Sequence, residues 1–303
     1  MAALSPLLAA LRRLLPLLAV IFVATSAMLV GFLLGRRPAR PPAQRLDVTV
    51  VNVGNGEAAW LRTPTGKFIL IGAGPPGAGR RVVDSLRAAG ARRIDLLILP
   101  YPYVDAIGGV PEVLRAFPVR GVFDPGYPSS PQHLPTQEEV RGLLAAAQVP
   151  IQVPRAGQDF RIGDVRLDLL APAQPLLDDK PREANNSIVL RVTFGQTAFL
   201  FAGGLERDGE NALLARAPEL QADWLRVSRF GTRGATSAEL LRLVRPSVAV
   251  ISVGKGNAGG YPHRETLECL AAAGARVYRT DQQDADLSFW SDGQRIVAPE
   301  EPR

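Results

Sequence analysis

The segment that decides the fold is Ile94–Gly109, with the sequence IDLLILPYPYVDAIGG. Its first six residues, IDLLIL, are apolar except for Asp95, which predicts a buried strand. The loop that follows carries Tyr101, Tyr103 and Asp105, and a helix is expected near 108–117. The segment therefore predicts one strand, loop and helix unit of an α/β protein.

The same rhythm extends on both sides of this segment. The remaining helical patterns are expected near 79–90, 136–147, 206–216, 236–244 and 263–273. Apolar or alternating runs predict strands within 46–53, 58–63, 67–71, 165–170, 186–194, 197–203, 222–228, 246–253, 276–280, 286–290 and 294–298. No fixed-period repeat interrupts them. We predict one continuous α/β domain over 46–298, with two packed sheets and helices outside, and a short tail over 299–303.

The charge is concentrated at the start of the chain. Of 303 residues, 47% are hydrophobic, which is enough for a sizeable core, and the formal net charge is +6. The first 45 residues contain six arginines and no acidic residue, so the remainder is balanced. Strong generic binding to nucleic acid is therefore not expected. A local patch of Arg226, Arg229 and Arg233 could contact an anionic partner, and a solvated face is the alternative.

A membrane anchor is predicted near the N-terminus. Residues 14–35 carry no charge over a length that can cross a bilayer, after an N-terminal segment over 1–13. Arginines flank the run, and a Pro/Arg linker follows over 36–45. The alternative is a signal peptide cleaved near residues 25–27, but the apolar run continues beyond that point. We expect a single-pass protein of the cell membrane, with the side of the domain left open.

Three smaller features are interpreted structurally. Gly72–Gly77 formally fits the dinucleotide pattern GxGxxG, but its two prolines remove backbone N–H donors that a pyrophosphate needs. Cys269, the one cysteine, lies at an apolar helical position and is expected to be a buried structural thiol. His133 lies in a polar loop and is expected to be solvated. No phosphate-loop, serine-hydrolase or zinc-protease motif occurs in the sequence.

Several segments together resemble the metallo-β-lactamase domain of ComEC-type competence (DNA-uptake) proteins, in the same order and over nearly the whole domain. The family has DVGQGD, LIDGG, THPHxDHIGG, NNxSLVL, LLTGDLE, KVxHHGSxxS and SVGxxNxxGHPH motifs. The corresponding segments here are Asn52–Glu57, Leu70–Gly74, Pro100–Gly109, Asn185–Leu190, Phe201–Glu206, Arg226–Thr232 and Ser252–His263. The resemblance implies an αββα sandwich.

The resemblance also implies that the metal ligands have been lost. The degenerate site positions are Tyr101, Tyr103, Asp105, Ala106, Gly204, Arg229, Phe230, Tyr261 and His263. Only Asp105 and His263 keep a good ligand type, and a catalytic zinc site needs about three protein ligands. We therefore expect no zinc, no metal ligand and no catalytic residue.

The three tyrosines have two alternative interpretations. Tyr101, Tyr103 and Tyr261 are ordinary packing residues, or they line a remodelled pocket for an anion or a peptide with Arg229 and Asp105.

The leading functional hypothesis is a non-catalytic, membrane-tethered domain that binds an unknown protein or ligand, linked to DNA uptake or an envelope process. The alternatives are a nuclease or phosphodiesterase with a rebuilt site, and a structural remnant.

Overall fold

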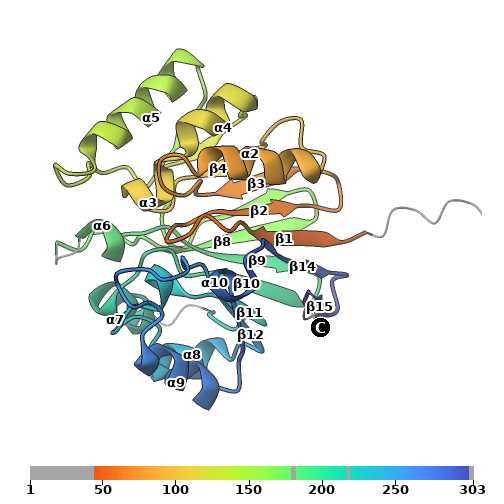
Figure 1. Cartoon of the computed structure of the whole chain (residues 1–303), viewed down its shortest axis with the longest axis vertical. Coiled ribbons are helices and arrows are strands. Elements are labelled where there is room, and N and C mark those ends of the chain that lie inside the picture. The colour runs from red at the N-terminus through yellow and green to blue at the C-terminus, as the bar shows by residue number, and fades with distance from the viewer. Residues whose placement is uncertain (1–43, 179–181, 217–218, 300–303) are drawn as a thin grey trace, which may run out of the picture. The chain divides into compact units, whose positions relative to one another are not determined.

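Two β-sheets pack face to face, and helices cover the outer face of each sheet (Figure 1). The computed structural model describes residues 44–178, 182–216 and 219–299. All of these residues except Gln44 belong to one compact unit, Arg45–Arg303. Its helix, sheet, sheet, helix layers are those of the predicted αββα sandwich.

The first sheet has eight strands, in the order β15-β14-β1-β2-β3-β4-β5-β6. Their bounds are β1 Leu46–Val50, β2 Ala59–Arg62, β3 Phe68–Ile71, β4 Leu96–Ile98, β5 Val122–Phe123, β6 Ile151–Gln152, β14 Leu287–Ser291 and β15 Ile296–Val297. Strands β3 to β6 run parallel to one another, and the strands from β15 to β3 pair antiparallel. The carboxyl ends of β1, β3 and β4 therefore lie at the same end of the sheet.

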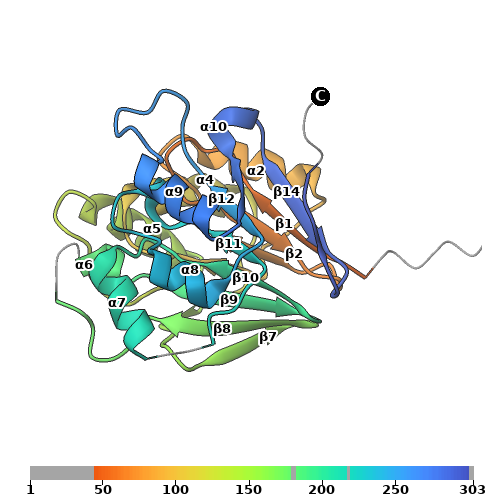
Figure 2. The same ribbon diagram turned by 90° about the horizontal axis from the view of Figure 1, so that it is seen from below.

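The second sheet has seven strands, in the order β13-β12-β11-β10-β9-β8-β7. Their bounds are β7 Asp159–Ile162, β8 Val165–Ala171, β9 Val189–Phe194, β10 Thr197–Phe201, β11 Trp224–Arg226, β12 Val248–Ile251 and β13 Arg276–Arg279. Strands β10 to β13 are parallel, so their carboxyl ends meet at one edge. Figure 2 shows α8 and α9 lying across this sheet, with β7 and β8 uncovered at its far edge.

The helices follow the predicted order. Their bounds are α2 Gly79–Ala88, α3 Val104–Ile107, α4 Val110–Ala116, α5 Leu134–Ala146, α6 Arg182–Asn185, α7 Arg207–Ala215, α8 Ala238–Val244, α9 Arg264–Ala272 and α10 Thr280–Gln283, with the 3₁₀ turn η1 Ser228–Gly231. The six helices expected from periodicity all form, with ends within about two residues of the expectation. The one-turn elements α3, α6, η1 and α10 are too short to produce a periodic pattern.

Three apolar cores hold the layers together. One lies between the sheets, and one lies between each sheet and its helices. Strand β3 explains the continuous apolar runs, since Ile69 and Ile71 enter the central core while Phe68 and Leu70 pack toward the helices. Strands buried on both faces need apolar residues at every position. Most strands of the two sheets could therefore be predicted from the sequence.

The sequence did not predict three strands, of which β6 and β7 are edge strands and β5 lies next to β6. Strands β5 and β6 have two residues each, and β7 exposes alternate polar side chains, including Asp159 and Arg161. Such segments form because a neighbouring strand offers free backbone groups, and their own sequence carries little signal.

The predicted anchor over 14–35, with its flanking segments, lies outside the described residues. In the part of the chain that the structure describes, no helix is long and apolar enough to cross a membrane.

Candidate functional site

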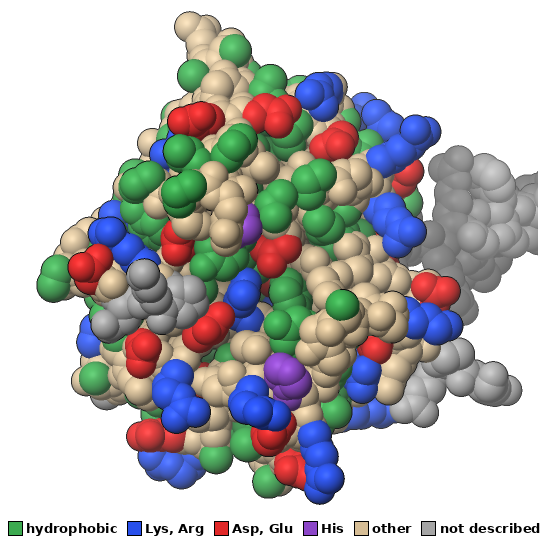
Figure 3. Space-filling view, turned by 60° about the vertical axis from the view of Figure 1, so that its left-hand side comes forward, with side chains coloured by type: hydrophobic (Ala, Val, Ile, Leu, Met, Phe, Trp, Pro, Cys, Tyr) green, Lys and Arg blue, Asp and Glu red, His purple; other side chains and the backbone are tan. Residues whose placement is uncertain are grey.

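The candidate site positions lie in loops and in the one-turn helices α3 and η1, at the end of the sandwich where the carboxyl ends of the parallel strands meet. Backbone hydrogen bonds tie these loops together, since the N–H of Glu57 donates to the carbonyl of Asp105 (3.0 Å). Across the two sheets, the N–H of Ile188 donates to the carbonyl of Pro100 (2.8 Å). On the corresponding side of the surface, basic and acidic side chains lie in a hollow between the histidines (Figure 3).

Tyr101 fills space that Gly204 leaves open. The tyrosine is fully buried, and a Cβ atom on Gly204 would lie 3.0 Å from two of its ring carbons. The N–H of Gly204 donates to the hydroxyl of Ser187 (2.9 Å), which fixes the glycine beside the ring. Burial raises the pKa of Tyr101 well above its usual range, and its hydroxyl has no hydrogen-bond partner among the described residues. The phenol therefore stays protonated.

Tyr103 continues this packing toward the surface. Its ring meets Tyr101 edge-on at 5.6 Å between centroids and stacks on His133 at 4.5 Å. The guanidinium of Arg229 lies 5.2 Å from the Tyr103 centroid. The expectation that His133 is simply solvated was wrong, because the histidine is half-buried against Tyr103 and burial lowers its pKa.

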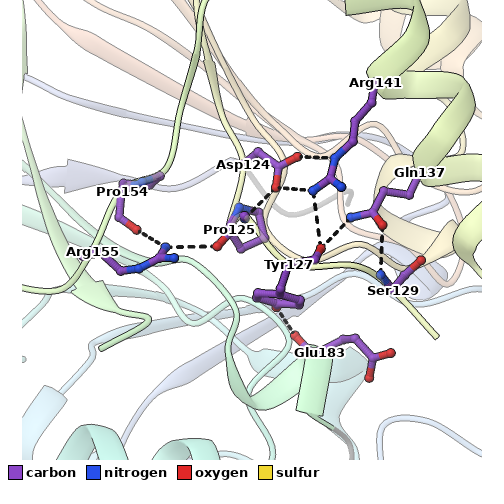
Figure 4. Close-up of polar contacts among 10 residues, drawn as sticks. Asp124, Pro125, Tyr127, Ser129, Gln137, Arg141, Pro154, Arg155 and Glu183 are labelled. Atoms are coloured by element: carbon purple, nitrogen blue, oxygen red, sulfur yellow. Dashed lines mark hydrogen bonds and ion pairs between the residues drawn. The ribbon is translucent and has the colours of Figure 1, made fainter. Parts of the chain in front are cut away.

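A hydrogen-bond network holds the loop that presents His133 (Figure 4). Arg141 binds both oxygens of Asp124 at 3.1 Å, and the side chain of Gln137 donates to the carbonyl of Tyr127 (2.9 Å). The hydroxyl of Tyr127 donates to the carbonyl of Glu183 (2.6 Å), next to the second sheet. The loop that covers Tyr103 is thus anchored from both sides.

Arg229 lies between two carboxylates at the centre of the site. Its Nη1 is 3.6 Å from Oδ2 of Asp105, and its Nε is 3.3 Å from Oε1 of Glu206. The residue has a φ of 44°, in the left-handed region that is uncommon for a residue with a side chain. Burial raises the pKa of Asp105 to about 6, and Arg229 offsets this only in part. A fixed cation therefore stands where the resemblance implies a histidine ligand.

Arg226 and Glu57 form a second, deeper ion pair. Arg226 is 1% exposed, and its Nη2 is 3.0 Å from Oε2 of Glu57. Burial raises the pKa of Glu57, and the attraction of Arg226 opposes that rise. Nearby, Gly72 brings its backbone so close that a Cβ would lie 2.1 Å from the carbonyl oxygen of Glu57. Close backbone packing therefore explains this first glycine of the GxGxxG pattern.

The three arginines considered as a possible local patch do not share one surface. Arg226 is buried against Glu57, and Arg229 is held by Asp105 and Glu206. Only Arg233 is exposed, and it pairs with Glu265 at 2.9 Å. The alternative, a wholly solvated face, is also wrong. Both expectations failed because the local sequence does not reveal which acids the fold brings to each arginine.

Tyr261 belongs to a separate aromatic group. Its ring contacts Phe230 at 5.8 Å and His263 at 5.0 Å between centroids, while Tyr101 and Tyr103 contact each other. Nδ1 of His263 accepts a hydrogen bond from the backbone N–H of Arg233 (2.7 Å). The structure thus brings two of the three tyrosines into contact and gives His263 a structural hydrogen bond at the start of α9.

These residues do not fit a zinc ion, the group that the fold family implies. Tyr101 occupies the space beside Gly204, which has no side-chain donor, and buried Ala106 offers none. Arg229 places a positive charge beside Asp105, which repels a cation. Within the described ranges, no three His, Cys, Asp or Glu side chains are grouped as metal ligands. The absence of bound metal in the protein itself stays a prediction.

Sequence reasoning missed Glu57, Glu206, Ser187 and the role of His133. The first three lie inside the motif segments that carry the resemblance, so their place in these motifs could have marked them as site residues. His133 offered none, because it is 30 positions from the ring on which it stacks. Only the path of the loop that precedes α5 brings the two together.

A methyl group added at Gly204 should test whether the Tyr101 ring depends on the space that this glycine leaves open. Gly204→Ala places Cβ against the Tyr101 ring, so we expect a loss of about 1–3 kcal/mol in unfolding free energy. In a Tyr101→Ala background the loss should largely vanish, as a double-mutant cycle by urea denaturation can measure. Gly142→Ala, on an open helix face, is the control and should not destabilise. Equal losses in both backgrounds would contradict the packing argument.

Asp105 should make stability depend on pH. Its folded pKa of about 6 lies above the unfolded value, so its contribution is fully present below about pH 4 and is lost as pH rises through 6. Between pH 4 and 7 the wild type should lose on the order of 1–2 kcal/mol more than Asp105→Asn in urea unfolding. The exposed Asp84→Asn should keep the wild-type pH dependence. An unchanged pH dependence in Asp105→Asn would refute this.

No family model matches the chain. Among curated proteins, it is 28% identical over 254 residues to ComE operon protein 3 of Bacillus subtilis, covering 78% of this chain and 32% of that protein. It is 29% identical over 261 residues to Competence protein ComA of Neisseria gonorrhoeae, covering 85% of this chain and 34% of that protein. The chain thus spans about a third of the length of these relatives.

Solved structures support the fold. The metallo-β-lactamase fold protein YhfI from Bacillus subtilis superimposes with a TM-score of 0.56 at 11% identity, covering 82% of this chain and all of that one. The CmlA β-hydroxylase E377D mutant matches with a TM-score of 0.51 at 13% identity, covering 86% of this chain and 55% of that one. Together, the relatives and the solved structures show a metallo-β-lactamase-like fold and a chain that is similar to part of the ComEC-type competence proteins.

Proposed function

We propose that the chain is a non-catalytic, membrane-anchored domain that binds a protein or ligand in DNA uptake. The observation that carries the non-catalytic part is the placement of Arg229 between Asp105 and Glu206, next to Tyr101 and Gly204. Metal-assisted hydrolysis needs ligands that leave one coordination position for water. Here the Tyr101 ring fills space beside Gly204, and the Arg229 guanidinium places a positive charge where a metal ion would need negative ligands.

The link to DNA uptake rests on the relatives. Their names refer to competence, and they match this chain over most of its length. The chain covers only a third of each relative, so their activity as whole proteins comes to this chain only as a proposal. Because residues 46–303 have no net charge, we expect weak affinity for generic nucleic acid and a more specific partner or ligand.

A hydrolase with a rebuilt site is the competing proposal. Tyr101 and one oxygen of Asp105 are buried without hydrogen-bond partners among the described residues, so they are the polar groups that such a reaction could use. The Tyr101 phenol is not suited to activating water at neutral pH, since burial holds it protonated. Asp105, with a pKa of about 6, is the group of the two that could act as a base. Metal and activity measurements on the purified domain separate the two proposals.

Purified 46–303 should contain far less than one zinc or manganese per chain by elemental analysis. It should show no metal-stimulated nuclease or phosphodiesterase activity, because the ligand set is incomplete. A chelator should leave the melting temperature unchanged, since three apolar cores support the fold. Tyr101→His alone should not restore metal binding. Near-stoichiometric metal with a chelator-sensitive melting temperature would return the hydrolase to first place.

The anchor proposal depends on the uncharged run at 14–35. The full-length chain should remain in the membrane pellet after washing with alkaline carbonate, which strips peripheral proteins. A chain that starts at residue 46 should appear in the supernatant. Release of the full-length chain by carbonate, or a mature N-terminus near residue 28, would refute the anchor.

A further inference from the structure

A large cavity lies away from the degenerate site, at the uncovered edge of the second sheet. Its volume is about 960 Å³, near the upper end for small-molecule pockets. The floor comes from the outer face of β8 and β9, and the walls come from the loop before β7 and the end of α7. None of its lining residues belongs to the degenerate site positions.

Four arginines line this cavity. Arg166 and Arg191 have carboxylate partners, since Arg166 lies 2.6 Å from Asp168 and Arg191 lies 2.9 Å from Glu219. Arg155 and Arg216 differ from them. Among the described residues, their guanidinium groups donate only to backbone carbonyls, and neither pairs with a carboxylate.

Arg155 and Arg216 are held in place although their charge is not neutralised. Arg155 donates to the carbonyls of Pro125 (3.0 Å) and Pro154 (2.9 Å), as Figure 4 shows. Arg216 donates to the carbonyl of Leu170, and burial lowers its pKa. A guanidinium fixed by carbonyls keeps other N–H groups available, in a planar arrangement that matches phosphate or carboxylate oxygens. Their restricted motion also reduces the entropy lost on binding.

We propose that this cavity binds a small phosphate ester whose remaining part carries hydroxyl groups, such as a sugar phosphate. Arg155 and Arg216 contact the phosphate, and the carboxylates of Asp168 and Glu219 accept hydrogen bonds from the hydroxyls. The lining contains no aromatic side chain on which a nucleobase would stack, which argues against a single nucleic-acid strand. This site is additional to the proposed function and does not depend on it.

The test is calorimetric titration of the full-length chain with ribose 5-phosphate, with ribose and a short oligodeoxynucleotide as comparison ligands. We expect ribose 5-phosphate to bind and ribose to bind at least tenfold more weakly. Arg155→Gln and Arg216→Gln should each weaken ribose 5-phosphate binding at least tenfold. Arg92→Gln removes the same charge from an exposed turn outside the cavity and should leave the affinity unchanged.

Two further measurements keep the result interpretable. Melting temperatures without ligand identify a variant that fails to fold, and Arg155→Lys and Arg216→Lys keep the charge while losing the planar donor group, so they should bind with an intermediate loss. The proposal is overturned if titration with ribose 5-phosphate up to a ligand concentration of about 10 mM shows no binding, since this range would detect even a millimolar Kd. It is also overturned if Arg92→Gln is equally impaired, or if the oligodeoxynucleotide binds more tightly with a steep salt dependence.

Discussion

The buried ion pair between Glu57 and Arg226 is the constraint on which the loop end of the sandwich depends. Arg226 ends β11 in one sheet, and Glu57 lies in the loop after β1 of the other, with 3.0 Å between charged atoms. Removing two charges from water costs several kcal/mol for each ion, and their attraction compensates only when both are correctly placed. The pair therefore favours one alignment of the sheets, and through it one arrangement of the loops.

The polar residues above this pair form a coupled set. Arg229 supplies positive charge between Asp105 and Glu206, which would otherwise repel each other at the same place. Tyr101 and Gly204 are complementary in volume, and Tyr103 with His133 closes the surface side. Each of these residues that differs from the family motifs is therefore matched in charge or in volume by a neighbouring residue. A site that has merely lost its ligands would be expected to leave cavities or unopposed charge instead.

The fold does not need a metal to explain its stability. One apolar core lies between the sheets and one lies under each helical layer, with strands such as β3 buried on both faces. Structural metals matter most in small domains whose cores are insufficient, and this domain is far larger. The fold can thus persist with a loop end that lacks the histidines of the family motifs, and the arginine-lined cavity lies at the uncovered edge of β7 and β8.

The sequence alone determined the layers, the six main helices and most strands, because apolar periodicity reports directly on burial. It also showed, through the motif around Tyr101 to Gly109, that histidines were absent from the expected positions. Only the tertiary structure decided how the charged and aromatic residues pair: Arg226 with Glu57, Arg229 with Asp105 and Glu206, and Tyr103 with His133. These partners are far apart in the chain. Their meeting depends on the alignment of two sheets and the path of long loops, which local periodicity does not encode.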